Sequence, residues 1–234
     1  MNAQNKKYTY EYPRPSVTTD CVIFGFDGYE LNILLVERGI EPFKGQWALP
    51  GGFLQMDETT EDCARRELTE ETGVRDLYLE QLYTFSDVKR DPRGRVITVS
   101  YYALVRSTDF KVIGGDDASA AKWFPIHQVP SLAFDHDRIL RVGHNRLKSK
   151  IRYEPIGFEL LEEIFTIPQL QRLYEAILGV QLDRRNFNRK ITSLDILKPI
   201  EKKLEGIGHK GARQFSFDKE KYQALKSRGL NFEI

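Results

Sequence analysis

The sequence predicts a mixed α/β domain followed by a helical region that ends in a helix-turn-helix and a hairpin. Segments 17–26 and 31–36 are rich in Val, Ile, Leu and Phe, and they flank the hairpin turn signal Asp27-Gly28. One helix-like segment, 59–72, interrupts further strand-like stretches. After about residue 130 the apolar residues recur at helical spacing. We therefore expect two domains, 1–152 and 153–234.

The remaining elements of the first domain follow from turn signals and apolar runs. Segments 77–85 and 96–105 are two more strand candidates, and Pro92-Arg93-Gly94 punctuates their connection. Segment 122–126 is a short strand that stops at Pro125. The helix over 59–72 ends at Gly73, which suits the left-handed C′ position.

The second domain reads as helix, short turn, helix and two-stranded hairpin, which is the element order of a winged helix-turn-helix. Thr166 and Gln169 form a capping box at the start of one helix, and Asp183 caps the next. The other predicted elements are helices at 135–147 and 157–164, and hairpin strands at 196–204 and 214–217 around the turn EGIGHKGA.

Composition excludes several classes of protein. Hydrophobic residues make up 41% of the chain and charged residues 29%, which is ordinary for a globular protein. No run approaches the roughly 20 apolar residues of a membrane helix, and the polar N-terminus lacks a signal-peptide core. Cys21 and Cys63 show no paired spacing. We expect a cytoplasmic protein without a membrane partner.

Charge is distributed unevenly along the chain. Residues 165–234 carry 14 Lys+Arg and 8 Asp+Glu, a net charge of +6, which leaves −5 for the preceding residues. A basic module favours a nucleic-acid partner. On charge alone, chance fluctuation of surface residues is the alternative.

The helix at 59–72 carries an acidic cluster. Glu67, Glu70 and Glu71 stand at i, i+3 and i+4, so their carboxylates share one helical face and repel one another. A divalent cation would relieve that repulsion, and Mg²⁺ prefers such hard oxygen ligands together with phosphates. A cation held there polarises a phosphoryl oxygen and activates water. Arg66 can orient a neighbouring carboxylate. The alternative is a solvated acidic face, the usual meaning of a glutamate cluster.

The whole stretch GFLQMDETTEDCARRELTEETGV resembles the box of the Nudix hydrolase family. The resemblance implies an α/β/α sandwich with the box as loop-helix-loop. It also implies a catalytic set in which Glu67, Glu70 and Glu71 bind Mg²⁺ or Mn²⁺, supported by Arg66 and Glu58. The matching positions are Gly52, Glu58, Arg66, Glu67, Leu68, Glu70, Glu71, Gly73 and Val74.

Residues outside the box are harder to assign. Asp116 and Asp117 precede the 122–126 strand and are candidates for a general base, although a Gly-Gly-Asp-Asp surface turn explains them equally well. Trp47 and Phe53 are expected to brace the box rather than to stack on a base.

A basic helix follows Asp183. Phe187 and Ile191 should face the core, whereas Arg185, Asn188 and Arg189 fall on the opposite side. Arginine grips guanine, asparagine pairs with adenine, and both hold phosphate. A solvated face, or packing on the acidic domain of a dimer mate, would explain the same pattern. The candidate DNA contacts are Arg184, Arg185, Asn188, Arg189 and Lys190, with Lys210 and Arg213 in the wing.

The segment PQLQRLYEAILGVQLDRRNFNRKI and the hairpin after it resemble the C-terminal domain of the Nudix-related transcriptional regulators. The resemblance implies a bacterial repressor that binds a palindromic double-stranded DNA operator as a homodimer. It also implies that the Nudix domain senses an effector, either an ADP-ribose-like nucleotide or a sugar such as arabinose. The sequence does not identify the effector-binding residues.

Two functions from different classes therefore remain open, and one chain can combine them. A DNA-binding regulator is favoured by the basic tail and the Arg-rich helix. A Mg²⁺-dependent hydrolase of a nucleoside diphosphate derivative such as ADP-ribose is favoured by the intact box, because many regulators of this kind have a degraded one.

Overall fold

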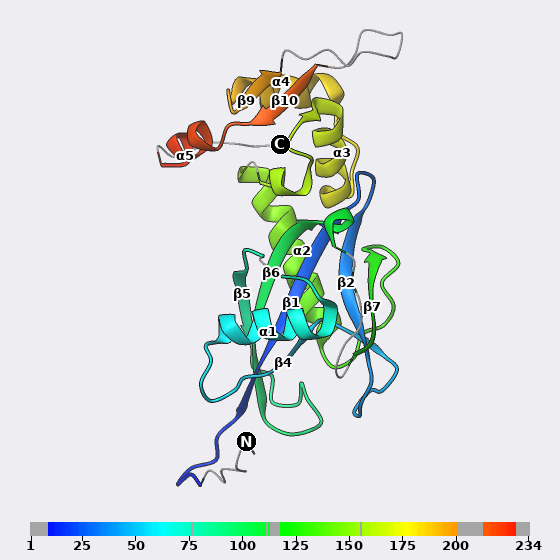
Figure 1. Cartoon of the computed structure of the whole chain (residues 1–234), viewed down its shortest axis with the longest axis vertical. Helices are drawn as coiled ribbons and strands as arrows, with labels where there is room; N and C mark the ends of the chain where they lie inside the picture. Colours follow the sequence, from blue (N-terminus) through cyan, green and yellow to red (C-terminus); the bar gives the residue numbers. More distant parts are fainter. Residues whose placement is uncertain are drawn as a thin grey trace.

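The computed structural model shows a sandwich domain with a smaller helical domain at one end (Figure 1). Helices α1 (Thr60–Thr72) and α2 (His136–Tyr153) lie on opposite faces of the main sheet (Figure 1). The structure describes residues 9–75, 77–110, 112, 118–154, 156–200 and 213–227.

Within the described residues the main sheet has seven strands, and β1 is its centre. β1 pairs in parallel with β6 and antiparallel with β2, while β4 pairs with the early part of β1 and β7 pairs with β2. The strands are β1 (Ser16–Phe26), β2 (Leu31–Arg38), β3 (Trp47–Ala48), β4 (Gly51–Phe53), β5 (Glu80–Phe85), β6 (Val96–Arg106) and β7 (Ala118–Pro125).

The side chains of β1 point alternately to the two faces of the sheet, and this explains why a helix covers each face. Cys21 and Ile23 belong to the buried cluster that includes Leu68 of α1, whereas Val22 and Phe24 belong to the cluster that includes Ile139 of α2. Successive side chains of a strand point to opposite faces, so a strand that is apolar throughout must be covered on both sides. The predicted sandwich is confirmed.

Helix α1 begins and ends where its caps predict. The Thr59 side chain accepts a hydrogen bond from the Asp62 backbone N–H, and the Asp62 carboxylate accepts one from the Thr59 N–H. Gly73 ends the helix at φ 73°, in the left-handed region that favours glycine. These caps place the box carboxylates at fixed points of a rigid helix.

The second domain has the predicted winged-helix order. Thr166 and Gln169 form the capping box of α3, Gly179 ends that helix, and Asp183 caps α4. β10 pairs antiparallel with both β8 and β9. None of the described helices is long and apolar enough to cross a membrane. The elements are α3 (Ile167–Leu178), α4 (Arg184–Ser193), β8 (Phe165–Thr166), β9 (Leu197–Ile200), β10 (Gln214–Phe217) and α5 (Lys219–Ser227).

One predicted helix is wrong. Segment 157–164 contains only a single 3₁₀ turn, Phe158–Leu160. Gly157 precedes it at φ 92°, and Phe158, Leu160 and Leu161 are all buried. Residues that are buried one after another are typical of a segment that passes between two packed domains. An amphipathic helix would bury only one stripe of its surface. Helix α2 runs further than predicted, α5 was not predicted, and residues 201–212 of the hairpin lie outside the described part.

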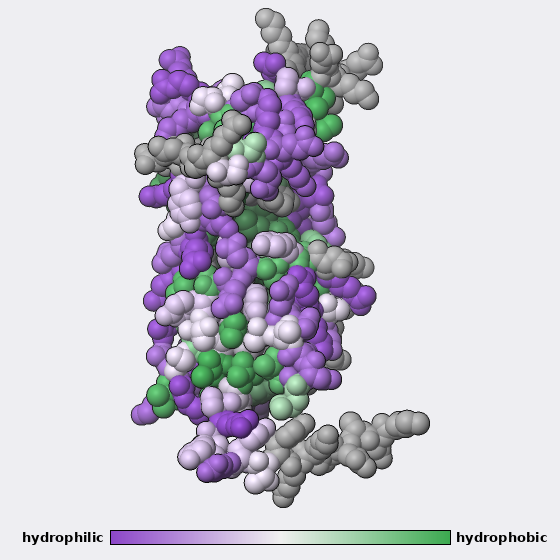
Figure 2. Space-filling view, turned by 90° about the vertical axis from the view of Figure 1, so that its left-hand side faces the viewer, coloured by the Kyte–Doolittle hydropathy of each residue, from purple (hydrophilic) through white to green (hydrophobic). Residues whose placement is uncertain are grey.

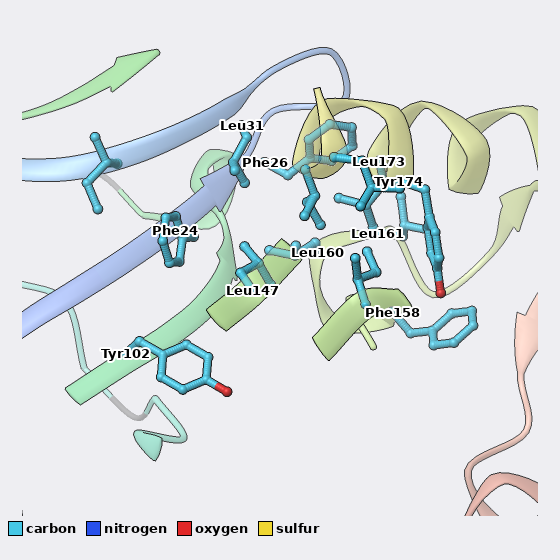
Figure 3. Packing of buried hydrophobic residues seen from close by; sticks show 14 of the residues in the cluster. Phe24, Phe26, Leu31, Tyr102, Leu147, Phe158, Leu160, Leu161, Leu173 and Tyr174 are labelled. Atoms are coloured by element: carbon cyan, nitrogen blue, oxygen red, sulfur yellow. The ribbon is translucent and has the colours of Figure 1, made fainter. Parts of the chain in front are cut away.

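One hydrophobic core continues from the sandwich into the winged helix. Phe26 and Leu31 at the end of the β1–β2 hairpin belong to the same buried cluster as Leu147 of α2 and Leu173 of α3. Figure 3 shows these side chains gathered between the sheet and α3. Among the described residues the junction is therefore a packed interface.

Replacing Leu173 by alanine is expected to destabilise the whole chain by about 2–5 kcal/mol, because this side chain is fully buried in the shared core. Urea denaturation followed by circular dichroism measures the change. Val180→Ala is the control, since Val180 is 52% exposed and its loss should stay within about 0.5 kcal/mol. A loss below about 1 kcal/mol for Leu173→Ala would contradict the shared core.

Candidate functional site

A cavity of about 870 Å³ opens beside the acidic face of α1. Its walls come from β1, β2, β4, α1, the loop after β5 and the start of α2. Three carboxylates of the box, Glu67, Glu70 and Glu71, line it together with Arg66. Four of the five predicted catalytic residues therefore line one polar pocket, whereas Glu58 does not line it.

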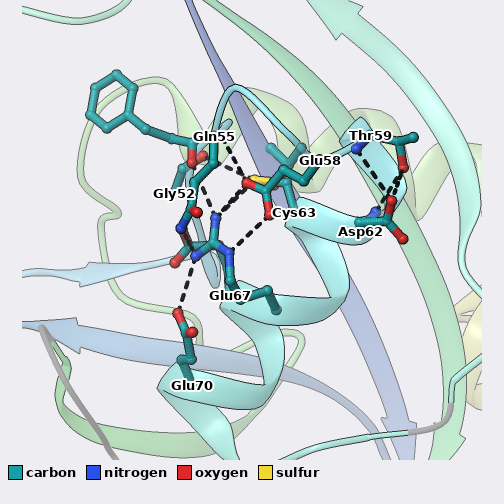
Figure 4. A network of polar contacts seen from close by, with 11 residues as sticks. Gly52, Gln55, Glu58, Thr59, Asp62, Cys63, Glu67 and Glu70 are labelled. Atoms are coloured by element: carbon teal, nitrogen blue, oxygen red, sulfur yellow. Dashed lines mark hydrogen bonds and ion pairs between the residues drawn. The ribbon is translucent and has the colours of Figure 1, made fainter. Parts of the chain in front are cut away.

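Arg66 is the centre of a polar network that includes Glu58, Glu67 and Glu70, which are labelled in Figure 4. Its guanidinium donates to both carboxylate oxygens of Glu58, at 2.7 and 3.0 Å. It also donates to Glu67 at 2.7 Å and Glu70 at 3.1 Å. The Arg66 hydrogen bonds hold the pKa of Glu58 at about 2, while burial opposes them. Arg66 and Glu58 are thus paired with each other, and their supporting role stays a prediction.

Glu67 and Glu71 are half-buried against the backbone of β4. Glu71 accepts a hydrogen bond of 2.9 Å from the Gly51 N–H, and burial raises its pKa to about 8. Burial also raises the pKa of Glu67, although the hydrogen bond and the charge of Arg66 act to lower it. Gly52 lies so close that a Cβ there would overlap the Glu67 carboxylate, so a larger residue at this position would displace that carboxylate. Arg66 neutralises part of the negative charge of these carboxylates.

The donor set fits a divalent cation, although the side chains are not gathered around one. Among the described residues, no three His, Cys, Asp or Glu groups converge as metal ligands, because Arg66 lies between Glu67 and Glu70. Carboxylate oxygens are the hard ligands that Mg²⁺ and Mn²⁺ prefer. Burial raises the pKa of Glu67 and of Glu71, and a cation bound beside them would favour their charged forms.

A second, deeper cluster lies on the cavity floor, and the sequence did not reveal it. Arg90 is 3% exposed, and its guanidinium contacts Asp135 at 2.7 and 3.1 Å and Asp20 at 3.3 Å. His136 accepts a hydrogen bond at Nδ1 from the Leu49 N–H, and burial lowers its pKa. These residues are far apart in the chain and share no spacing, so no motif could identify them.

The rim of the cavity carries stacked aromatic and guanidinium groups. Arg93 lies 4.6 Å from the ring centre of Phe53 and 5.0 Å from that of Phe134, while Arg38 lies 4.8 Å from Phe134. Phe134 has φ 55°, a conformation that is strained for a non-glycine residue. The rim thus carries planar aromatic and guanidinium side chains. The acidic wall, formed by Glu67, Glu70 and Glu71, carries carboxylates.

Helix α4 presents its predicted basic face to solvent. Phe187 and Ile191 are buried, whereas all five candidate residues of this helix are exposed. A shallow depression on α4 is lined by its arginines and Asn188. Figure 2 shows that hydrophilic side chains cover much of this end of the molecule on the face seen there. The exposed candidates are Arg184, Arg185, Asn188, Arg189 and Lys190.

The remaining candidates divide into two groups. Arg213 is exposed at the start of β10, with its guanidinium 5.5 Å from the Phe215 ring centre. Lys210 and the two general-base candidates, Asp116 and Asp117, lie outside the described residues. Trp47 packs edge-on against Phe124 and so braces the β2 side of the sandwich, whereas Phe53 is 41% exposed.

Fold and site together define a Nudix protein with an attached DNA-binding module. The NUDIX domain model matches residues 14–142, and the NrtR DNA-binding winged helix domain model matches residues 157–217. The chain belongs to the Nudix-related transcriptional regulators, in which a Nudix domain is joined to an NrtR-type winged helix.

Relatives of the same architecture cover nearly the whole chain. The ADPR responsive transcriptional repressor NtrR of Acinetobacter baylyi is 36% identical, over 95% of this chain and 90% of its own length. Shewanella oneidensis NrtR, solved in complex with a 27mer DNA, matches with TM-score 0.74 and 34% identity, over 88% of this chain and 95% of its own. The NUDIX domain of that NrtR, solved with ADP ribose, matches with TM-score 0.53 and 38% identity, over 58% of this chain and 90% of its own.

Proposed function

We propose that this protein is a transcriptional repressor that binds an operator through α4 and responds to ADP-ribose bound in the Nudix cavity. Residues 153–234 form its DNA-binding domain and residues 1–152 its effector-binding domain. The observation that carries the proposal is the exposed basic face of α4. In the described part of the chain, Arg184 and Arg185 form no ion pair, although their positive charge is unfavourable in the first turn of a helix.

The face of α4 suits the major groove of double-stranded DNA. The second helix of a helix-turn-helix places its N-terminal residues on base edges, and arginine and asparagine are the side chains that read guanine and adenine. Arg189 donates to the Asn186 side chain at 3.0 Å, which holds its guanidinium near the helix. A homodimer presenting two such helices would bind a palindromic operator.

The cavity suits a nucleoside diphosphate derivative. Its acidic wall supplies Glu67, Glu70 and Glu71, which would hold Mg²⁺ or Mn²⁺ facing the diphosphate. A cation bound there would neutralise phosphate charge and polarise a phosphoryl oxygen. A repressor described as ADPR responsive and an NrtR NUDIX domain solved with ADP ribose support this effector rather than arabinose.

Capture of sheared genomic DNA by the full-length protein near physiological salt tests the proposal. We expect enrichment of a few palindromic fragments and their release by ADP-ribose, since the operator-binding and effector-binding sites lie on one chain. Salt must be controlled because low salt strengthens binding to any basic surface. Arabinose is the control ligand. Recovery of bulk DNA alone would contradict the regulatory function, and release by arabinose but not by ADP-ribose would contradict the effector.

Hydrolysis of ADP-ribose is a second candidate function. The specific observation that favours it is the complete box, in which Arg66 orients Glu58 and Glu67 beside Glu70 and Glu71. A chain that senses a ligand without cleaving it has no need to keep every one of these side chains. The two activities are compatible in one protein, because they use the same cavity.

A further inference from the structure

We propose that Phe53, Arg93 and Phe134, together called the rim stack, bind the nucleobase of the effector. The inference rests on the proposed nucleotide effector and adds which part of the cavity takes which part of the ligand. The diphosphate would lie at the acidic wall and the base at the rim stack. All three side chains line the same cavity as the box carboxylates.

Arg93 is held in place by a buried carboxylate. Its Nε and Nη2 donate to Asp91 at 3.0 and 2.6 Å, and its backbone N–H donates to the same carboxylate at 2.9 Å. The Asp91 side chain is 2% exposed, and despite burial its hydrogen bonds with Arg93 lower its pKa. The guanidinium is therefore fixed before any ligand arrives.

This pairing decides what Arg93 offers to a ligand. The edge of its guanidinium and much of its charge are already matched by Asp91, and the guanidinium lies over the rings of Phe53 and Phe134. Arg38 is similar, because its Nε and Nη2 donate to the backbone carbonyls of Pro42 and Ile40. Flat guanidinium and phenyl faces suit a planar, uncharged partner better than a phosphate, which needs donor edges.

Phe53 connects the rim stack to the acidic wall. Its carbonyl oxygen accepts a hydrogen bond of 3.2 Å from Arg66, the arginine that also holds Glu67 and Glu70. Phe53 is 41% exposed, and the Arg93 guanidinium lies over its ring. A ring that braced the box would be buried, so the exposure favours a ligand contact over the bracing expected from the sequence. A ligand with a base next to a diphosphate can reach both surfaces.

Calorimetric titration of the full-length protein with ADP-ribose, in the presence of Mg²⁺, tests the rim stack. Phe53→Leu should weaken binding about tenfold, since base–aromatic stacking contributes roughly 1–3 kcal/mol and about 1.4 kcal/mol corresponds to a factor of ten. Arg93→Lys should weaken it similarly, because lysine keeps the charge beside Asp91 but loses the flat face. Phe53→Tyr keeps the ring and should bind like the wild type.

Two controls separate stacking from general damage. Tyr78→Leu removes an aromatic ring that is 82% exposed outside the cavity and should leave the affinity unchanged. Inorganic pyrophosphate lacks a base, so its ability to compete with ADP-ribose should be the same in wild type and Phe53→Leu when corrected for ADP-ribose affinity.

The outcomes distinguish this inference from the function on which it rests. Wild-type binding of ADP-ribose with an unchanged affinity in Phe53→Leu would overturn the rim stack alone. An equal loss of ADP-ribose and pyrophosphate binding would overturn it too, since the change would then act on the diphosphate. Failure of the wild type to bind ADP-ribose would overturn both the effector and the rim stack.

Discussion

Replacement of Arg185 and Arg189 together by alanine is expected to weaken binding to a specific operator about a hundredfold or more and to leave the fold intact. Each bidentate contact to a base is worth roughly 1–3 kcal/mol, and the two guanidinium groups lie on the exposed face of α4. Neither side chain belongs to the core, which Phe187 and Ile191 supply. Thermal unfolding should therefore be unchanged.

An electrophoretic or anisotropy titration near physiological salt measures this effect against an operator recovered from genomic DNA. The matched control removes the same two charges elsewhere: Arg75→Ala with Arg141→Ala, both exposed on the Nudix domain. That pair should change the affinity only slightly, because long-range charge is screened within about 8 Å. Operator affinity that survives the loss of Arg185 and Arg189 would disprove the role of α4.

If the protein cleaves ADP-ribose, Glu70→Gln is expected to lower the turnover number about a thousandfold. A cation that stabilises phosphoryl charge contributes several kcal/mol to the transition state, and each 1.36 kcal/mol corresponds to a factor of ten. The amide keeps the size of the side chain but removes the charge that would hold the cation. Glu70 is 41% exposed, so the fold should tolerate the change.

Release of AMP from ADP-ribose in the presence of Mg²⁺ is the measurement. Glu61→Gln on the same helix is the control, because Glu61 pairs with Arg65 and does not line the cavity. Chelation of the metal should reproduce the effect of Glu70→Gln in the wild type. A turnover number that is unaffected by Glu70→Gln would remove the acidic wall from the reaction.

Sequence reasoning worked wherever one local segment carries the information. The box lies on a single capped helix, so Glu67, Glu70 and Glu71 could be placed on one face from their spacing alone. The same is true of the capping box at Thr166 and of the basic face of α4. Caps and periodicity act over a few residues, and tertiary contacts did not override them here.

Sequence reasoning failed where the site is built from segments that are distant in the chain. Arg90, Asp20 and Asp135 form one buried cluster through contacts that span 45 and 70 residues. The rim stack likewise combines β4, the loop after β5 and the residues before α2, and one of its members has positive φ without being glycine. Segment 157–164 was predicted as a helix because its apolar residues were counted without knowing that two domains cover them.

The core that runs through both domains affects how this chain is made. Phe26 and Leu31 leave the ribosome early, yet the buried cluster that contains them also contains Leu160, Leu173 and Tyr174, which are synthesised much later. Until α3 emerges, one end of the sheet remains an exposed apolar surface of the kind that chaperones recognise. The winged helix thus covers apolar surface of the domain that precedes it, and premature termination before α3 should leave that surface exposed and the product more prone to aggregation.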